Sequence, residues 1–180
     1  GLDWRRDTVR LNVVQEQIDI GVRIDHLADS RLIARKIGET CEKIVMAPDL
    51  LRRLGKPEDF ADLQKNYPLA AVLNHNNGRA DTWYINENLQ FTPAKPHFVG
   101  SHIHNALQAA LAGNAVSQQL DWVVAPYLIS GELVELFAEV PKIRWPVSIY
   151  RPQRVVTPMR VKVVFDLLAG ILGKRFELPA

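Results

Sequence analysis

Cysteine is scarce in this sequence, and the features that mark secreted or membrane proteins are missing. Cys41 is the single cysteine among 180 residues, so the chain cannot close an intramolecular disulfide, which favours a reducing, cytoplasmic location. The opening residues GLDWRRDTVR lack the apolar core of a secretion signal. No apolar run approaches the roughly 20 residues that span a bilayer, so we expect no membrane partner.

Charge of either sign is nowhere concentrated. The 22 basic and 20 acidic residues are scattered and give a net charge of +2. We therefore do not expect this segment to bind nucleic acid by itself. Apolar residues make up 47 % of the chain, and four tryptophans, six phenylalanines and four tyrosines argue against disorder. A chain of this size and composition forms one domain or two small lobes with a real core.

Short apolar segments with strand character alternate with segments that repeat at the helical period. Strands are expected over residues 18–24, 42–48, 69–73 and 146–152, and helices over residues 7–17, 49–55 and 157–172. Residues 32–37 fit neither pattern clearly, and both remain open there. The alternation predicts an α/β architecture with largely parallel sheets.

The segment HFVGSHIHNALQAALAGNAV carries the clearest local pattern. A strand is expected to reach Gly100, and Ser101 is the predicted N-cap of the helix that follows. The helix is predicted from an apolar stripe that stops at Gly113 and is made by Ile103, Leu107, Ala110 and Leu111.

Three histidines lie close together in the same segment, at His97, His102 and His104. On a strand, His102 and His104 would share a face, and His97 could complete a site with three nitrogen ligands. If Ser101 caps a helix, however, the two histidines in its first turn diverge by about 200°. We therefore predict no metal site, although an enzyme that uses this cluster remains a third class of function.

Motifs for covalent catalysis and cofactor binding are absent from the sequence. Cys41 stands between Thr40 and Glu42 beside an apolar strand, which is typical of an inert, packed thiol. There is no G-x-S-x-G motif, and no glycine-rich phosphate loop follows any predicted strand. We predict no catalytic residue, no cofactor and no enzymatic activity.

Polar side chains follow three of the predicted strands. They are Arg23, Asp25 and His26 after the first, Ser101 and His102 after another, and Ser117, Gln118 and Gln119 after a third. In an open α/β sheet these strand ends border the crevice where ligands bind, because helix N-termini direct free N–H groups there. The pattern predicts a cleft for a small polar or anionic molecule, although each residue alone could simply cap a helix or solvate a loop.

One long stretch and three later stretches occur in a recognisable order. They are VVQEQIDIGVRIDHLADSRLIARKIGETCEKIVMAPDLLRRLGKPEDFADL, ALQAALAGNAV, LISGELVELF and PVSIYRPQRVVTPMRVKVVFDLL. Together they resemble the effector-binding domain of LysR-type transcriptional regulators. The resemblance implies an α/β fold with two lobes, of the type II periplasmic-binding-protein kind, joined by two crossovers around an effector cleft.

The resemblance also implies where the lobes begin and end. We expect the crossovers near Asn66–Pro68 and Lys142–Trp145. Lobe I is then formed by residues 1–66 and 144–180, without the first strand and helix that the family has, and lobe II by residues 67–143.

The resemblance implies that particular residues of this chain bind the ligand. These are Arg23, Ile24, Asp25, Gly100, Ser101, His102, Ser117 and Gln118. The run AVSQQL stands where the family has an apolar GIALLP, which indicates a ligand with hydrogen-bonding groups, or a wall that is hydrated without one. Arg23 replaces a glycine of the family pattern, and either places a cation at the rim, consistent with an acidic effector, or is a surface residue.

By this resemblance the chain is the effector-sensing domain of a bacterial DNA-binding regulator. A small-molecule effector would bind between the lobes. Operator DNA would be reached only through the family's N-terminal winged helix-turn-helix, which this sequence lacks, and a homodimer or homotetramer is expected. The alternative is a free-standing solute-binding receptor of the same fold.

Overall fold

The computed structural model of the chain describes residues 18–24, 31–74, 77–153 and 157–176. The helix predicted over residues 7–17 and the candidate residues Asp25 and His26 lie outside these ranges. The chain divides into two compact units, unit 1 formed by Gly1–Thr40 with Arg144–Ala180 and unit 2 formed by Cys41–Ile143. The backbone therefore passes between the units twice, at residues 40–41 and 143–144.

Residues 41–66 belong to unit 2, whereas the sequence led us to place them in lobe I. The reason is that strand β3 (Glu42–Met46) pairs with β9 (Val116–Leu120) and β10 (Val134–Leu136), which lie far along the chain. The preceding strand β2 (Leu32–Thr40) pairs instead with β11 (Trp145–Pro152) of unit 1. Residues 32–46 thus form one nearly continuous extended stretch, in which β2 belongs to the sheet of unit 1 and β3 to the sheet of unit 2. Only the pairing with distant strands shows where the stretch divides between the units.

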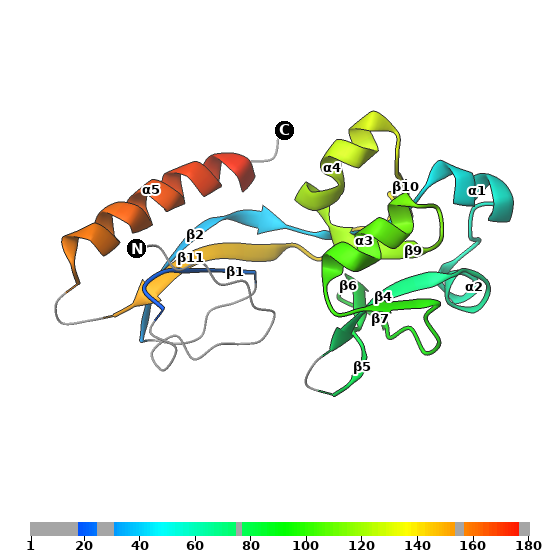
Figure 1. Ribbon diagram of the computed structural model, residues 1–180, viewed down its shortest axis with the longest axis horizontal. Coiled ribbons are helices and arrows are strands. Elements are labelled where there is room, and N and C mark those ends of the chain that lie inside the picture. The colour runs from blue at the N-terminus through cyan, green and yellow to red at the C-terminus, as the bar shows by residue number, and fades with distance from the viewer. Residues whose placement is uncertain (1–17, 25–30, 75–76, 154–156, 177–180) are drawn as a thin grey trace. The chain divides into compact units, whose positions relative to one another are not determined.

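In unit 1 a long helix covers a three-stranded antiparallel sheet. The strand order is β1-β11-β2, with β1 formed by Gly21–Ile24. Helix α5 (Met159–Phe176) lies along β2 and β11 (Figure 1). It buries Phe165 and Ala169, four residues apart, against Val147 and Ile149 of β11. This spacing is the helical period of the sequence, so the helix predicted there is confirmed.

Unit 2 combines a six-stranded sheet, a hairpin and four helices among its described residues. The sheet order is β10-β3-β9-β4-β5, and β8 also pairs with β4. The strands not yet given are β4 (Leu69–Asn74), β5 (Arg79–Ala80), β8 (Phe98–Gly100) and, in the hairpin, β6 (Trp83–Asn86) and β7 (Leu89–Phe91). The helices are α1 (Pro48–Leu54), α2 (Phe60–Asn66), α3 (Ile103–Leu111) and α4 (Asp121–Ser130).

The expectation of largely parallel sheets was wrong. Strand β4 runs parallel to β8 and β9, but every other strand pair in the described residues is antiparallel. Parallel strands need a crossover, such as the one by which α3 connects β8 to β9 on either side of β4. Of the remaining pairs, β4–β5 and β6–β7 join consecutive strands, and the others bring together strands that lie far apart in the sequence. An alternating order of strands and helices does not by itself fix strand direction.

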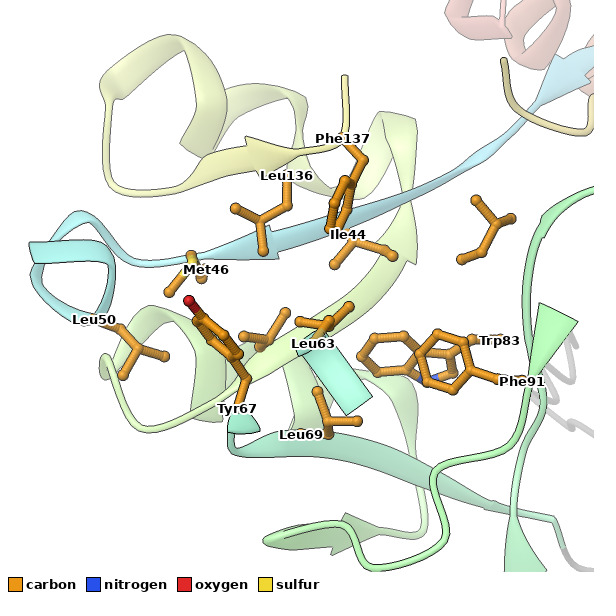
Figure 2. Packing of buried hydrophobic residues seen from close by; sticks show 12 residues of the cluster. Ile44, Met46, Leu50, Leu63, Tyr67, Leu69, Trp83, Phe91, Leu136 and Phe137 are labelled. Atoms are coloured by element: carbon orange, nitrogen blue, oxygen red, sulfur yellow. The ribbon is translucent and has the colours of Figure 1, made fainter. Parts of the chain in front are cut away.

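The two faces of the unit 2 sheet pack against different partners. Ile44 of β3 points to one face, where it joins an apolar cluster that includes Trp83 of the hairpin (Figure 2). Val45, its neighbour, points to the opposite face and packs with Leu107 of α3. Because successive strand residues face opposite sides, the same alternation on β9 decides which of its polar side chains lie toward α3.

Candidate functional site

Strand β9 carries three polar side chains in succession that are all buried. Ser117 and Gln119 have 0 % exposed surface, and Gln118 has 7 %. The sequence had suggested that these residues follow the end of a strand. In the structure they lie within strand β9. Because a buried polar group costs free energy unless it is hydrogen-bonded, the partners of these side chains matter for what the strand can do.

The three side chains divide between the two faces of the sheet. Gln118 donates from Nε2 to the carbonyl oxygen of Tyr84 at 2.9 Å, on the side of the β6–β7 hairpin. Gln119 donates from Nε2 to the carbonyl oxygen of Ile103 at 3.2 Å and to Ser117 Oγ at 2.7 Å, on the side of α3. Ser117 and Gln119 therefore belong to one polar group, and Gln118 to another.

One acceptor in this group has no partner among the described residues. Gln119 Oε1 is buried and receives no hydrogen bond. Turning the amide to exchange Oε1 with Nε2 would place an acceptor against the Ile103 carbonyl oxygen, which also accepts and needs a donor opposite it. A buried acceptor without a donor costs about 1–3 kcal/mol, so a donor is called for at this position.

The N-terminus of α3 lies directly beside this polar group, because Ile103 is the first residue of the helix. His102, with φ −135° and ψ 146°, is the N-cap, whereas the sequence predicted Ser101. The His102 side chain makes no capping hydrogen bond within the described part of the chain, and both His102 and Ser101 are exposed. A helix N-terminus carries a partial positive charge that favours anions.

Gly100 brings strand β8 close to the first turn of α3. A Cβ atom at this position would stand 2.7 Å from the Cβ of Asn105. Only glycine allows the strand end and the helix start to approach so closely. Of the candidate residues, Gly100, Ser101 and His102 directly precede α3, and Ser117 is linked to the start of the helix through the Gln119 amide.

The candidate residues of unit 1 occupy strand β1. Arg23 pairs with Ser148 and is half-buried, and Ile24 pairs with Val147. The Ile24 side chain packs against the apolar core of unit 1. Asp25 and His26 lie outside the described residues, so the ligand-binding role expected of Asp25 stays a prediction.

A largely buried acid in unit 2 was not singled out from the sequence. Burial raises the pKa of Glu42 to about 7, and the neighbouring Asp81 carboxylate adds to the increase. Asp81 in turn accepts a hydrogen bond from Asn74 Nδ2 at 2.7 Å. A glutamate that opens an apolar strand, in the stretch EKIVM, is the only sequence signal that could have marked this position.

Metal ligands do not converge in the described ranges: no group of three or more histidine, cysteine or acidic side chains there could hold an ion. His97 and His104 are both exposed. Within the same ranges, no helix has the length and hydropathy needed to cross a membrane.

Comparison with known proteins gives the family. The model of the LysR substrate binding domain matches residues 6–172. The transcriptional regulator CrgA of Neisseria meningitidis is 26 % identical over 167 residues, which cover 91 % of this chain and 54 % of CrgA. The transcriptional activator TtdR of Escherichia coli is 23 % identical over 175 residues, covering 94 % of this chain and 54 % of TtdR. The chain spans about half the length of these relatives.

Solved structures share the fold. The CrgA regulatory domain superposes with a TM-score of 0.76 at 21 % identity, covering 92 % of this chain and 81 % of that domain. The regulatory domain of AphB from Vibrio vulnificus gives a TM-score of 0.76 at 19 % identity, with coverage of 95 % and 83 %. Both are LysR regulatory domains, so the predicted two-lobed fold of the type II periplasmic-binding-protein kind is confirmed. With its family model matched over most of its length, the chain belongs to the LysR substrate-binding domains, the effector-binding domains of LysR-type transcriptional regulators.

Proposed function

We propose that this chain senses a small polar or anionic effector for a bacterial LysR-type regulator and catalyses no reaction. The observation that carries the proposal is the start of α3, where an N-terminus without a His102 cap lies beside the buried polar group of β9. Helix N-terminal N–H groups bind carboxylates and other anions without a positively charged side chain. The relatives are HTH-type regulators, which favours a regulator over a free-standing receptor.

The proposed site in unit 2 is formed by Gly100, Ser101, His102 and Ser117. Gly100 sets the close approach of strand and helix, and the exposed Ser101 and His102 offer a hydroxyl and an imidazole to the effector. Ser117 is buried and accepts a hydrogen bond from Gln119 Nε2. From unit 1 we propose Arg23 as a cation for an acidic effector, with Ile24 and Asp25 following it along the chain.

The proposed signal is a change in the arrangement of the lobes. An effector shifts an equilibrium only if it binds one arrangement more tightly than the other. In the whole regulator, which we propose to be a cytoplasmic homodimer or homotetramer, this shift would reposition a separate DNA-binding domain on its operator. This chain would contact no DNA itself.

Thermal denaturation with a panel of small organic acids, amino acids and sugars tests the proposal. An effector at about 100 times its Kd stabilises the folded state by about 2.7 kcal/mol, which is visible as a saturable rise in Tm. The double variant Ser101→Ala with His102→Ala should lose this rise. His97→Ala, which removes an exposed imidazole ahead of β8, is the matched control and should retain it. Saturable binding that survives the double variant contradicts the proposed site.

A further inference from the structure

Helix α5 exposes apolar side chains on the face turned away from its own sheet. Its buried face, with Phe165 and Ala169, packs on the unit 1 sheet, where the helix lies along β2 and β11 (Figure 1). The exposed apolar residues recur every three or four positions and so form one continuous stripe along the helix. This α5 stripe consists of Met159, which is 72 % exposed, Val163 and Leu167, both 58 %, Ile171, 56 %, and Val164, 39 %.

The α5 stripe is large enough to be an interaction surface. The five exposed fractions correspond to roughly 500 Å² of apolar surface, whereas monomeric proteins rarely expose apolar patches larger than a few hundred Å². A matching stripe on a partner would bring the total buried surface to about 1,000 Å², the lower limit for a specific interface. The stripe therefore supports a weak, reversible association.

The order of residues along the stripe fits a second copy of the same helix. Val163 and Val164 precede Leu167 by four and three residues, and Gly170 and Ile171 follow it by three and four. When two α5 helices lie antiparallel with Leu167 of each at the centre, residues 163–164 of one copy lie opposite residues 170–171 of the other. Such a pairing uses the same patch on both copies, as two-fold symmetric dimers do.

Gly170 gives the valines of a second copy room to pack. It is exposed, and in the described part of the chain no heavy atom lies within 4 Å of the position that a Cβ there would take. Glycine is unfavourable in the middle of a helix, and the packing of unit 1 does not require it at this open position. Because the distance between two packed helices depends on the side chains at their contact, a glycine in the stripe allows a close approach.

The charged residues beside the stripe decide how the association responds to salt. Arg160 and Lys174 stand seven residues before and after Leu167, so an antiparallel pair brings them near each other at both ends of the interface. Asp166, the single acidic residue of α5, is already paired with Arg35 of β2 at 3.1 Å. Salt screens the repulsion at the two ends and should therefore strengthen the pairing. Binding of an acidic protein or an anionic membrane to the same basic helix would weaken with salt.

We propose that the α5 stripe is a homodimer interface, in which two copies of the chain pair antiparallel around Leu167 of each. This inference gives a surface to the homo-oligomer of the proposed function and rests on that part of it. It does not depend on effector binding at the start of α3. The thermal panel of effectors and the measurements of association can therefore fail separately.

Sedimentation equilibrium of the 180-residue chain over a range of protein concentrations tests the association. The unmodified chain should change from monomer to dimer as its concentration rises, and the dimer should be favoured more at about 0.5 M than at about 0.05 M salt. Leu167→Glu places two carboxylates at the centre of the pair and should raise the dissociation constant at least about tenfold, the effect of about 1.4 kcal/mol. Ile129→Glu makes the same kind of change at a position of α4 that is 87 % exposed, and this control should leave the association unchanged.

Cysteine substitution tests the centre of the pairing. Two copies of Leu167→Cys bring their sulfur atoms together at the two-fold axis and should form an intermolecular disulfide under mild oxidation. Val163→Cys is the control, because residue 163 lies about 12 Å along the helices from residue 163 of the other copy, which is too far for a disulfide. The native Cys41 is buried, and the unmodified chain gives its background.

Four results overturn the inference. They are a chain that stays monomeric at every concentration, a dimer that weakens as salt rises, a dimer that survives Leu167→Glu in a variant whose folding is verified by circular dichroism, and equal disulfide formation by Leu167→Cys and Val163→Cys. Saturable effector binding by a chain that stays monomeric would leave the sensing role of the proposed function intact while removing this interface.

Discussion

Gln119 donates a hydrogen bond from Nε2 to the main-chain carbonyl of Ile103 across 3.2 Å and so fastens strand β9 to the first turn of helix α3. The same nitrogen is bonded to Ser117 Oγ at 2.7 Å, which fixes the orientation of the amide. The oxygen at the other side of that amide is buried without a donor among the described residues. The side chain therefore gains little net stability from burial, even though its position is well defined.

We expect Gln119→Leu to lower the free energy of unfolding by about 1–3 kcal/mol, because the Ile103 carbonyl and Ser117 Oγ lose the donor that Nε2 supplies, although one unmet acceptor is removed as well. Urea denaturation followed by circular dichroism measures this change. No measurable loss would contradict the role of Nε2 in holding strand β9 to the first turn of α3.

Gly100→Ala should destabilise unit 2 by about 1–3 kcal/mol, the usual cost of forcing an extra carbon into a packed site. Its new Cβ would stand 2.7 Å from the Cβ of Asn105, on the same turn of α3 that Gln119 holds. Gly170→Ala in α5 is the matched control, because nothing lies within 4 Å of the position that its new methyl group would take. That control should raise the free energy of unfolding by about 0.5–1 kcal/mol, since alanine favours a helix over glycine. Changes of the same sign in both variants would contradict the close approach.

Local patterns in the sequence predicted the elements whose determinants are local. Helix α3 follows from the spacing of Ile103, Leu107 and Ala110, and α5 from its own apolar stripe. The strands at 42–46 and 69–74 coincide with short apolar runs. The N-cap of α3 differs by one residue, from Ser101 to His102, which is within the usual variation of helix ends.

Features that depend on distant partners could not be predicted in this way. Strand β2 is exposed at residues 33–36 and pairs along its length with β11, more than a hundred residues later in the chain. The division of the chain at residues 40–41 follows from the same long-range pairing. The sequence could have predicted that Gln118 lies on the opposite face of the sheet from Ser117 and Gln119, because successive residues of a strand point to opposite faces.

Leu63→Ala should destabilise unit 2 by about 2–5 kcal/mol, the range for removing a large apolar side chain from a core. Leu63 has 0 % exposed surface and packs in the cluster that Figure 2 shows. Since the apolar clusters of the two units share no residue among those described, hydrogen exchange should accelerate within residues 41–143 first. Val147→Ala, in the core of unit 1, should reverse the pattern. Equal acceleration in both units for both variants would contradict separate cores.

Glu42 should make the stability of unit 2 depend on pH. Its pKa in the folded chain is about 7, because burial and the nearby Asp81 carboxylate disfavour the charged form, whereas 4.5 is the value of a freely solvated glutamate. Between these values the folded state holds a proton that the unfolded state has lost, so the free energy of unfolding falls as pH rises. Stability is greatest below about pH 4.5 with respect to this group, and the decrease ends above about pH 7.

Glu42→Gln removes the charged form and should abolish this slope. At about pH 8 the variant should be more stable than the unmodified chain by up to about 3 kcal/mol, and at about pH 4.5 the two should be nearly equal. Glu87→Gln, at an exposed position in the β6–β7 turn, controls for the loss of one acidic side chain and should leave the slope unchanged. Chemical denaturation across this range measures all three proteins. If Glu42→Gln keeps the slope of the unmodified chain, the proton held near neutral pH belongs to another group.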